Sequence, residues 1–321
     1  MAEARAVAVV VPVLDEAESL PALLADLAAQ EPAPAEIVVV DAGSTDGTLD
    51  LLRAEALRLP ALRVVESPGA TPGRGRNEGV RASAAALVVT LDAGSRVGPG
   101  FVRALAATVA AGPRAVAVGV AEPDARSAFE RAAGWFTLRA FKPPDAPGPI
   151  GAEFLPAGRN GLAFAREAWE EAGGYPPDLP WGEDKLFLRA LRAAGYELTA
   201  VPEAVVRWRP RGSPRALWRQ YRNYGRGDAL GRVDRQNELV TLGLLAVAVA
   251  LAVLAALGSR TAGALLVAGA AGYLALFVLA ARRDLGVDRA LLWVPAVRLL
   301  VDAAKVQGFL EGTLLRLVRR A

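Results

Sequence analysis

The stretch Ile37–Thr48, with the sequence IVVVDAGSTDGT, decides the fold of this chain. Four β-branched residues run into a turn that holds two carboxylates and two glycines, and a helix is predicted from Thr48 onward. In an open parallel sheet, ligands bind beyond the carboxyl ends of the strands, which is where Asp41 lies. The stretch therefore predicts a strand, turn and helix unit that binds a polar ligand, with a nucleotide as the candidate.

Strands and helices alternate through the first half of the chain. Strands are predicted at residues 7–13, 37–41, 63–66, 86–91 and 114–120, and helices from residue 19 and over residues 48–59, 75–85 and 99–111. This alternation is typical of parallel strands joined by crossover helices, hence of an α/β sheet. Asp15, Asp41 and Asp92 follow three of the strands, so we expect them at one edge of the sheet.

The amino-acid composition limits which catalytic groups, metal sites and partners the chain can have. The 321 residues include no cysteine and no histidine, which excludes disulfides, thiolate nucleophiles, Cys or His metal sites and a histidine base. A general base must therefore be sought mainly among Asp and Glu. The net charge of +3 is too small to indicate nucleic acid as a partner. The arginines instead gather just before an apolar region, where anionic lipid or a diphosphate would suit them.

The C-terminal part of the chain carries two long apolar runs. Residues 239–257 and 261–281 contain no charged side chain, and each is near the roughly 20 residues that a helix needs to cross a bilayer. We interpret them as a transmembrane hairpin; the alternative, two buried helices of a soluble bundle, would normally show polar faces. The predicted division is a cytoplasmic domain over residues 1–235 and a membrane domain over residues 236–321.

Charge predicts how the hairpin is oriented. Residues 7–13 are too short for a signal-peptide core, so the first domain should stay in the cytoplasm. Arg282 and Arg283 follow the second run and an arginine-rich segment precedes the first, which favours the same side for both. Residues 289–320 are predicted to form an amphipathic helix at the membrane surface. These features predict a multi-pass protein of the cell membrane, in contact with membrane lipids.

Five motifs in order resemble those of family 2 glycosyltransferases with the GT-A fold. They are VPVLDE at residues 11–16, VVDAGSTDGT at 39–48, GRGRNEG at 73–79, LDAGS at 91–95 and GED at 182–184. The resemblance covers residues 7 to about 231. It implies a Rossmann-like, mostly parallel α/β catalytic domain, followed here by an α-helical membrane segment.

The resemblance implies a nucleotide-sugar donor, such as a UDP- or GDP-sugar. Its base, ribose and phosphates would be bound by Pro12, Asp15, Glu16, Asp41, Ser44, Asp46, Arg74, Arg76, Asn77 and Asp92. The chemistry agrees in kind, because carboxylates suit ribose hydroxyls and an arginine matches phosphate with paired donors. For Asp41 and Asp46 the alternative is a turn in which the side chain caps the next helix.

Asp92 stands at the first position of the DxD motif of this family, whose carboxylate holds a divalent metal against the donor diphosphate. Mg²⁺ or Mn²⁺ is the implied cofactor, since hard cations take oxygen ligands and complete their shell with waters and phosphates. The third position here is Gly94, so the second acid is missing. We expect Arg207, Arg209 or Arg211 to supply part of the missing positive charge.

Glu183 and Asp184 match the acidic pair of the family, in which one member is the catalytic base. The base would take the proton from an acceptor hydroxyl as its oxygen attacks the anomeric carbon with inversion. We favour Asp184 as the base, with Glu183 as the alternative. A structural role competes for Glu183, because a helix N-terminus attracts negative charge whether or not the carboxylate is catalytic. A hydroxyl of a lipid-linked or membrane-associated acceptor needs a base, whereas a polyprenyl phosphate, the second possibility, does not.

The segment before the first apolar run has aromatic and basic residues where processive relatives carry QxxRW. Gln220, Tyr221, Tyr224 and Arg226 are predicted on the diphosphate or acceptor side, because aromatic rings stack on sugars and arginines bind diphosphates. The alternative is a juxtamembrane helix whose arginines contact lipid phosphate.

Two other classes of protein compete with a membrane-bound hexosyltransferase. A nucleotidyltransferase would share an α/β sheet and basic loops, but Leu14, Asp15 and Glu16 stand where a glycine-rich, lysine-containing phosphate loop would be expected. A non-catalytic sugar-nucleotide sensor or scaffold would fit the thinned metal motif, and the intact acidic pair argues against it.

Overall fold

The structure is a computed structural model that describes residues 6–138, 147–151, 158–233 and 235–318, with side chains from residue 239 in the last range. The chain divides into two compact units. The first comprises Met1–Asp124 and Ala140–Arg209, and the second comprises Ala125–Arg139 and Pro210–Ala321. The expected boundary after residue 235 differs from this division, because two helices that precede residue 235, at residues 128–138 and 214–231, group with the apolar helices.

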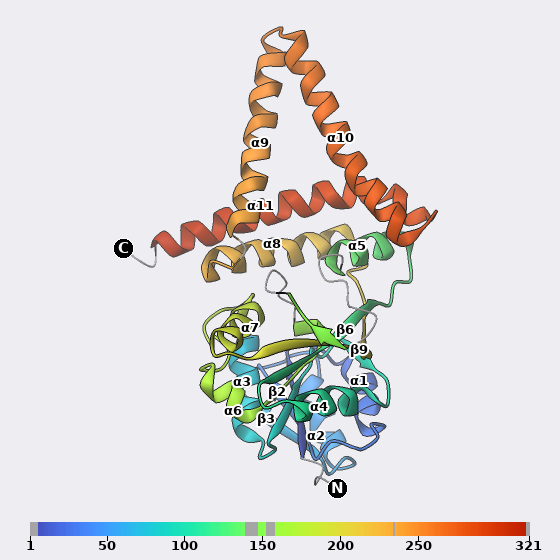
Figure 1. The fold of residues 1–321 in the computed structure, drawn as a ribbon, viewed down its shortest axis with the longest axis vertical. Coiled ribbons are helices and arrows are strands. Elements are labelled where there is room, and N and C mark those ends of the chain that lie inside the picture. The colour runs from blue at the N-terminus through green and yellow to red at the C-terminus, as the bar shows by residue number, and fades with distance from the viewer. Residues whose placement is uncertain (1–5, 139–146, 152–157, 234, 319–321) are drawn as a thin grey trace. The chain divides into compact units, whose positions relative to one another are not determined.

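The first unit begins with four parallel strands, as predicted (Figure 1). The elements are β1 (Val7–Val13), α1 (Leu20–Ala28), β2 (Glu36–Asp41), α2 (Thr48–Ala56), β3 (Leu62–Glu66), α3 (Pro72–Ala82) and β4 (Leu87–Thr90). β1 lies between β2 and β4, and β3 lies outside β2. The register pairs Val13 with Asp41 and Asp41 with Glu66, so the carboxyl ends of these strands lie at one edge.

The second half of the sheet is mixed in direction, which the sequence did not predict. The further elements are β5 (Ser95–Val97), α4 (Phe101–Ala111), β6 (Ala115–Pro123), β7 (Gly148–Pro149), η1 (Gly158–Asn160), β8 (Leu162–Ala165), α6 (Arg166–Glu171), α7 (Glu183–Ala193) and β9 (Glu197–Trp208). β8 lies antiparallel between β4 and β6, and β9 runs parallel to β6 and antiparallel to β5. The sheet is therefore mostly parallel, with antiparallel strands inserted in its second half.

The sheet is covered by helices on both faces. Val9 and Val11 of β1 pack in a core with α1, α2 and α4, whereas Val10 packs in a second core with α3, α6 and α7. Successive strand residues point to opposite faces, so a strand buried on both sides reads as a continuous apolar run. This is the physical reason that residues 7–13 and 37–40 lack polar residues.

Helix α3 begins at Pro72, three residues before the predicted start. Thr71 caps it, because its hydroxyl accepts the backbone N–H of Arg74, and proline is favoured in a first turn. The helix then lies close against β1 and β2. A Cβ on Gly79 would be 2.3 Å from Cγ1 of Val10, so only glycine fits at this contact.

The second unit is helical. It contains α5 (Ala128–Leu138), α8 (Pro214–Gly231), α9 (Arg235–Ala256), α10 (Arg260–Leu285), η2 (Arg289–Leu292) and α11 (Val294–Val318). Leu239–Ala256 and Arg260–Leu285 are long and apolar enough to cross a membrane, with mean hydropathies of 2.7 and 2.3. This chain itself buries 0% and 6% of the two segments, whereas the core helix of a soluble bundle would be mostly buried.

Helices α8 and α11 pack backbone to backbone within the second unit (Figure 1). A Cβ on Gly308 would be 1.8 Å from the carbonyl oxygen of Arg222, and one on Gly225 would be 2.2 Å from that of Lys305. Small residues allow such close approach in membrane-associated helices. Arg222 also pairs with Glu311 at 2.8 Å. Within residues 289–318, the segment predicted as one helix at residues 289–320 forms η2 and α11, and α11 packs against α8. Its place at the membrane surface stays a prediction.

The contact between α3 and β1 gives a prediction about stability. Gly79→Ala should lower the free energy of unfolding by about 1–3 kcal/mol, because its Cβ must displace the stiff side chain of Val10. Gly98→Ala is the matched control, since nothing lies within 4 Å of the position of its Cβ. Thermal unfolding of the detergent-solubilised chain measures both. Equal stability of the two variants would contradict the close packing of α3.

Candidate active site

The turn after β2 is organised by the carboxylate of Asp41. This side chain is buried, and its Oδ2 accepts the backbone N–H groups of Gly43 and Ser44 at 2.9 and 3.1 Å. Its Oδ1 accepts the Ser44 hydroxyl at 2.5 Å. Asp41 therefore holds the turn through bonds to Gly43 and Ser44, which precede α2, and its role in donor binding stays a prediction. The carboxylate fixes the backbone of a turn whose outer residues are exposed.

The loop after β1 is tied to the same turn. Asp15 accepts the backbone N–H of Thr45 at 2.8 Å, and its own N–H donates to the Ser44 hydroxyl at 2.9 Å. Asp46 accepts the N–H groups of Thr48 and Ala17, and the Thr48 hydroxyl bond lowers the pKa of Asp46. These bonds make one rigid rim from two loops, and side chains of both loops are accessible at the surface.

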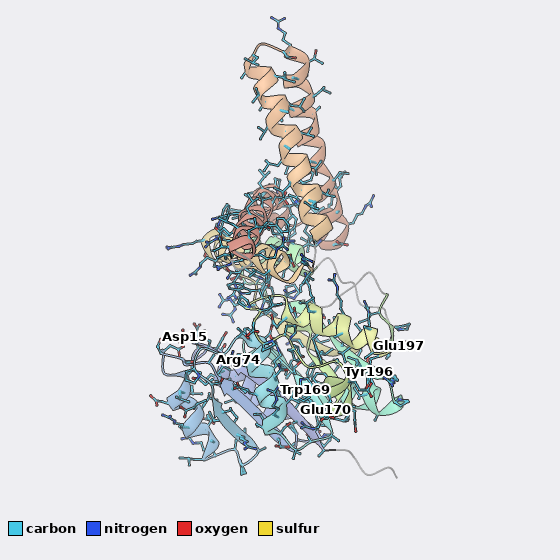
Figure 2. The ribbon with its side chains drawn as sticks, turned by 90° about the vertical axis from the view of Figure 1, so that its left-hand side faces the viewer. Asp15, Arg74, Trp169, Glu170, Tyr196 and Glu197 are labelled. Carbon is cyan, nitrogen blue, oxygen red and sulfur yellow. The ribbon has the colours of Figure 1, made fainter. Side chains whose placement is uncertain are left out.

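Other predicted donor residues lie around this rim. Glu16 accepts the Ser19 hydroxyl, and its N–H donates to Thr48 Oγ1 at 2.9 Å. Pro12 is half-buried at the end of β1, and a Cβ on Gly75 would be 3.1 Å from Pro12 Cβ. Arg74 is half-exposed, within 3.9 Å of Asp178. Figure 2 labels Asp15 and Arg74, both of which reach the surface of this unit.

The guanidinium of Arg76 lies at the centre of the site. Its Nη2 is 2.6 Å from Oδ1 of Asp92, and its Nη1 is 2.6 Å from Oε1 of Glu183. The side chain is only 5% exposed and lies over the ring of Tyr175. Burial acts to lower the pKa of Arg76, but the charges of Asp92 and Glu183 outweigh it and raise the pKa. Arg76 is therefore a permanent buried cation between two acids.

The two adjacent acids of α7 have different surroundings. Glu183 is buried against Arg76, and burial raises the pKa of its carboxyl while the guanidinium opposes that change. Asp184 is half-buried, and its Oδ2 accepts the backbone N–H of Gly158 at 2.6 Å. Its Oδ1 accepts the N–H of Lys185 at 2.7 Å. The acids therefore point to different neighbours although they are consecutive residues.

Gly158 marks the point where the charged groups converge, and the sequence analysis missed it. A Cβ built on Gly158 would be 3.0 Å from Arg76 Nη2, 3.5 Å from Asp184 Oδ2 and 3.6 Å from Asp92 Oδ1. Any other residue would place a methyl group among these three side chains. The signal in the sequence was the pair of glycines in the stretch GRNG at residues 158–161, just before an apolar strand.

Asn77 supports the site from beneath. Its Oδ1 accepts the indole N–H of Trp169 and the backbone N–H of Tyr175, both at 2.9 Å, and its Nδ2 donates to the Tyr175 carbonyl at 2.7 Å. Trp169 is labelled in Figure 2. The amide of Asn77 is thus buried and bonded to the protein, and its expected role in donor binding stays a prediction.

The basic residues predicted for the diphosphate are divided between the two units. In the first unit, Arg207 and Arg209 are exposed at the end of β9, whose register pairs Trp208 with Ser95. This end therefore lies beside the turn that follows Asp92. Arg159 lies over the ring of Trp208 at 5.4 Å and adds a cation that the sequence analysis did not include.

The remaining predicted residues belong to the second unit. Arg211 donates from Nε to Gln220 Oε1 at 3.3 Å, and Gln220 Nε2 donates to the Tyr224 hydroxyl at 2.7 Å. The Tyr221 hydroxyl is 3.2 Å from that of Thr137, and Arg226 is half-buried on α8. Arg211, Gln220 and Tyr224 are thus joined by hydrogen bonds, and the predicted contact of these residues with acceptor or diphosphate stays a prediction.

The oxygen atoms that the protein offers near Asp92 supply only part of the coordination shell of a divalent metal. Among the described residues there is no cluster of three or more acidic side chains that could hold a metal ion alone. Asp92 is 40% exposed, and Arg76 occupies one of its oxygens. A cation that binds through one carboxylate and two phosphate oxygens would fit here, because Mg²⁺ commonly completes its shell with waters and substrate phosphates.

The fold and site define the class of protein. The structure of the mannosyltransferase PcManGT from Pyrobaculum calidifontis, in complex with GDP-Man and Mn²⁺, is similar with a TM-score of 0.68 and 23% identity over 96% of this chain and 88% of that one. S. aureus TarS 1–349 in complex with UDP-GlcNAc is similar with a TM-score of 0.50 and 17% identity over 69% of this chain and 66% of that one. The fold is the GT-A fold.

Models of protein families that match the sequence identify the family of this chain. The model described as Glycosyl transferase family group 2 matches residues 87–282, and that of Glycosyl transferase family 2 matches residues 8–150. This chain belongs to glycosyltransferase family 2, and it is a hexosyltransferase. Two curated proteins are similar in sequence. The succinoglycan biosynthesis protein ExoA of Rhizobium meliloti is 27% identical over 69% of this chain and 68% of its own length. The validoxylamine A glucosyltransferase of Streptomyces hygroscopicus subsp. limoneus is 38% identical over 35% of this chain and 25% of its own length.

The raised pKa of Glu183 predicts how stability depends on pH. The folded protein retains this proton at pH values where the unfolded chain, near the ordinary pKa of 4.5, has lost it. This contribution to stability is full below 4.5 and is lost as the pH rises through the folded value. The Glu183→Gln variant lacks this titrating carboxyl. Between acidic and neutral pH, the melting temperature of the variant should therefore fall less than that of the wild type. Glu170→Gln, on the surface of α6, should follow the wild type, and parallel curves for all three would contradict the shift.

Proposed function

We propose that this chain is a membrane-bound, inverting glycosyltransferase with a cytoplasmic catalytic domain. It transfers a hexosyl group from a UDP- or GDP-sugar to a hydroxyl of a lipid-linked or membrane-associated acceptor. The observation that carries the proposal is the convergence of Asp92, Asp184 and Arg76 beside Gly158, at the edge of the sheet where the first strands end.

The rim formed by the loops after β1 and β2 suits the nucleoside end of the donor. Asp41 holds the turn, so the exposed Asp15 and Asp46 are pre-organised for hydroxyl or imide groups. Asp92 lies at the end of β4, next to β1 in the sheet, and would hold the diphosphate end together with a divalent cation. That cation, when bound, neutralises charge that develops on the leaving diphosphate. Arg159, Arg207 and Arg209, which lie near this end, add positive charge to that of the buried Arg76.

Asp184 suits the role of the base. In a single displacement, the acceptor oxygen forms a bond to the anomeric carbon while the bond from that carbon to the diphosphate oxygen breaks. The acceptor proton passes to Asp184, and the nucleoside diphosphate leaves. Both oxygens of Asp184 accept backbone N–H bonds, which hold the carboxylate in one orientation. A hydroxyl acceptor is favoured because it is the acceptor class that needs such a base.

The helical unit supports a place at the membrane. The spans 239–256 and 260–285 are joined by a short turn, and basic residues lie at the far ends of both, which favours the cytoplasm for those ends. On α11, the exposed side chains of Leu299, Leu310, Leu314 and Leu317 follow helical spacing. An apolar face of this kind suits a helix that lies in the bilayer surface, with its other face on α8.

A panel of nucleotide sugars tests the proposal. The full-length chain in detergent or lipid is incubated with UDP-glucose, UDP-GlcNAc, UDP-galactose, GDP-mannose and extracted membrane lipid, and released nucleoside diphosphate is measured. We expect turnover with one donor, loss of that turnover in Asp92→Ala and in excess chelator, and a product with inverted anomeric configuration by NMR. Full turnover in chelator would remove the metal from the proposal. Retained configuration would remove the single displacement, and release of pyrophosphate would overturn the reaction class.

A further inference from the structure

Arg76 connects three elements that are distant in the sequence. It projects from α3 and contacts Asp92, which follows β4, and Glu183, the first residue of α7. Each acid takes a different terminal nitrogen of the guanidinium. Because this group is planar and rigid, the distance between the two carboxylates is fixed by the fork itself, which a flexible ammonium could not do.

We propose that Arg76 is a positioning residue that sets the separation between Asp92 and the first turn of α7, with Glu183 as its anchor. This assignment rests on the proposed function and deepens it. Glu183 then has no part in proton transfer, and the carboxylate that reaches the acceptor is that of Asp184. The adjacent acids are thereby given separate roles.

The packing holds Arg76 in one place. The ring of Tyr175 lies beneath its guanidinium at 5.4 Å, and the Tyr175 hydroxyl is 3.1 Å from the buried hydroxyl of Thr90 on β4. The backbone of Tyr175 is bonded on both sides by Asn77, from the same helix as Arg76. The guanidinium therefore rests on a ring that is itself fixed to α3 and β4.

A glycine on α3 explains how Glu183 reaches Arg76. A Cβ on Gly73 would be 2.4 Å from the carbonyl oxygen of Pro176 and 3.2 Å from Cγ of Glu183. The start of α7 thus packs directly on the first turn of α3. Glu183 enters this contact with its methylene groups, and its carboxylate ends on Nη1 of Arg76.

Helix geometry separates the two acids of α7. Consecutive residues of an α-helix point about 100° apart, so Glu183 and Asp184 cannot face the same group. Glu183 faces the buried cation, and Asp184 faces Gly158 and the convergence point. For Glu183 to accept a proton from the acceptor, it would have to turn away from the buried guanidinium and give up one of its two charged contacts, which is unfavourable.

Charge balance gives Arg76 a second reason to be at this position. Asp92, Glu183 and Asp184 are three acids within one small region, and Arg76 lies against two of them with Asp184 close by. Like charges so close together repel each other and would repel a diphosphate. The buried cation holds the acids together without occupying the exposed side of Asp92.

Four variants of the full-length chain test the positioning role. They are Arg76→Lys, Glu183→Gln, Asp184→Asn and the control Arg81→Lys, which changes an exposed arginine on the same helix. Turnover is measured with the donor found in the panel and is divided by the number of sites that bind UDP or GDP in calorimetry. This normalisation separates positioning from folding, because a purely structural defect removes sites and leaves the turnover of each remaining site unchanged.

The expected results differ among the variants. Arg81→Lys should stay within about twofold of the wild type. Arg76→Lys should lose about 10²-fold in turnover per site, since one ammonium cannot span both acids and small misplacements carry costs of that size. Glu183→Gln should keep turnover within about tenfold, because its amide oxygen still accepts from Arg76. Asp184→Asn should lose about 10²- to 10⁴-fold while it still binds nucleotide, as expected for a lost base.

Three outcomes would overturn the inference. Arg76→Lys equal to Arg81→Lys would remove the positioning role. Glu183→Gln as inactive as Asp184→Asn would make Glu183 a participant in proton transfer, and this comparison holds even if Arg76→Lys does not fold. If the wild-type protein shows turnover, either of these two results leaves the proposed function intact. Absence of turnover with every donor in the wild type would overturn the proposed function and this inference together.

Discussion

The pair of buried contacts that Arg76 makes with Asp92 and Glu183 is the constraint on which the site depends. A buried charge is unfavourable unless it is paired, so the elements that carry these residues must meet in one arrangement. The end of β4, the start of α7 and helix α3 are thereby fixed relative to one another. Asp184 and Gly158 lie next to these contacts, so their positions are fixed by the same packing.

The sheet supplies the frame for that contact. β1 and β2 are buried on both faces, and their register brings the loops that follow them to one edge, where they bond to each other through Asp15, Ser44 and Asp46. The short helix η1, which begins at Gly158, leads into the inserted strand β8, and β8 pairs with β4, so Gly158 lies close to Asp92. The donor rim therefore comes from the parallel half of the sheet, and the proposed chemistry needs the mixed half as well.

The sequence predicted the parallel half because its signals are local. Apolar β-branched runs such as residues 37–40 end in acidic turns, and the motifs at 11–16, 39–48 and 91–95 mark the edge where a ligand binds. The two apolar helices followed equally from length and composition. The mixed half was not predicted, since β8 is a short run, LAFA, that any buried segment could contain, and β9 includes Pro202.

The sequence motifs could not predict the direction in which the side chains of the site point. Arg76 and Asn77 stand in a motif that implies donor binding, yet both are buried, because their partners Glu183, Tyr175 and Trp169 come from segments distant in the sequence. Glu183 and Asp184 were indistinguishable as neighbours in the sequence, and only the packing of α7 on Gly73 separates them. Gly158 was missed for a related reason: its partners come from α3, α7 and the end of β4.

A double-mutant cycle on Arg76 and Glu183 tests the central claim most directly. Turnover per nucleotide-binding site is measured for Arg76→Lys, Glu183→Gln and the double variant against the wild type. If the two side chains act through one shared contact, the double variant should be no slower than Arg76→Lys alone, so the effects on turnover are not additive. Effects that multiply independently would contradict the account, because Arg76 and Glu183 would then act on the reaction by separate routes.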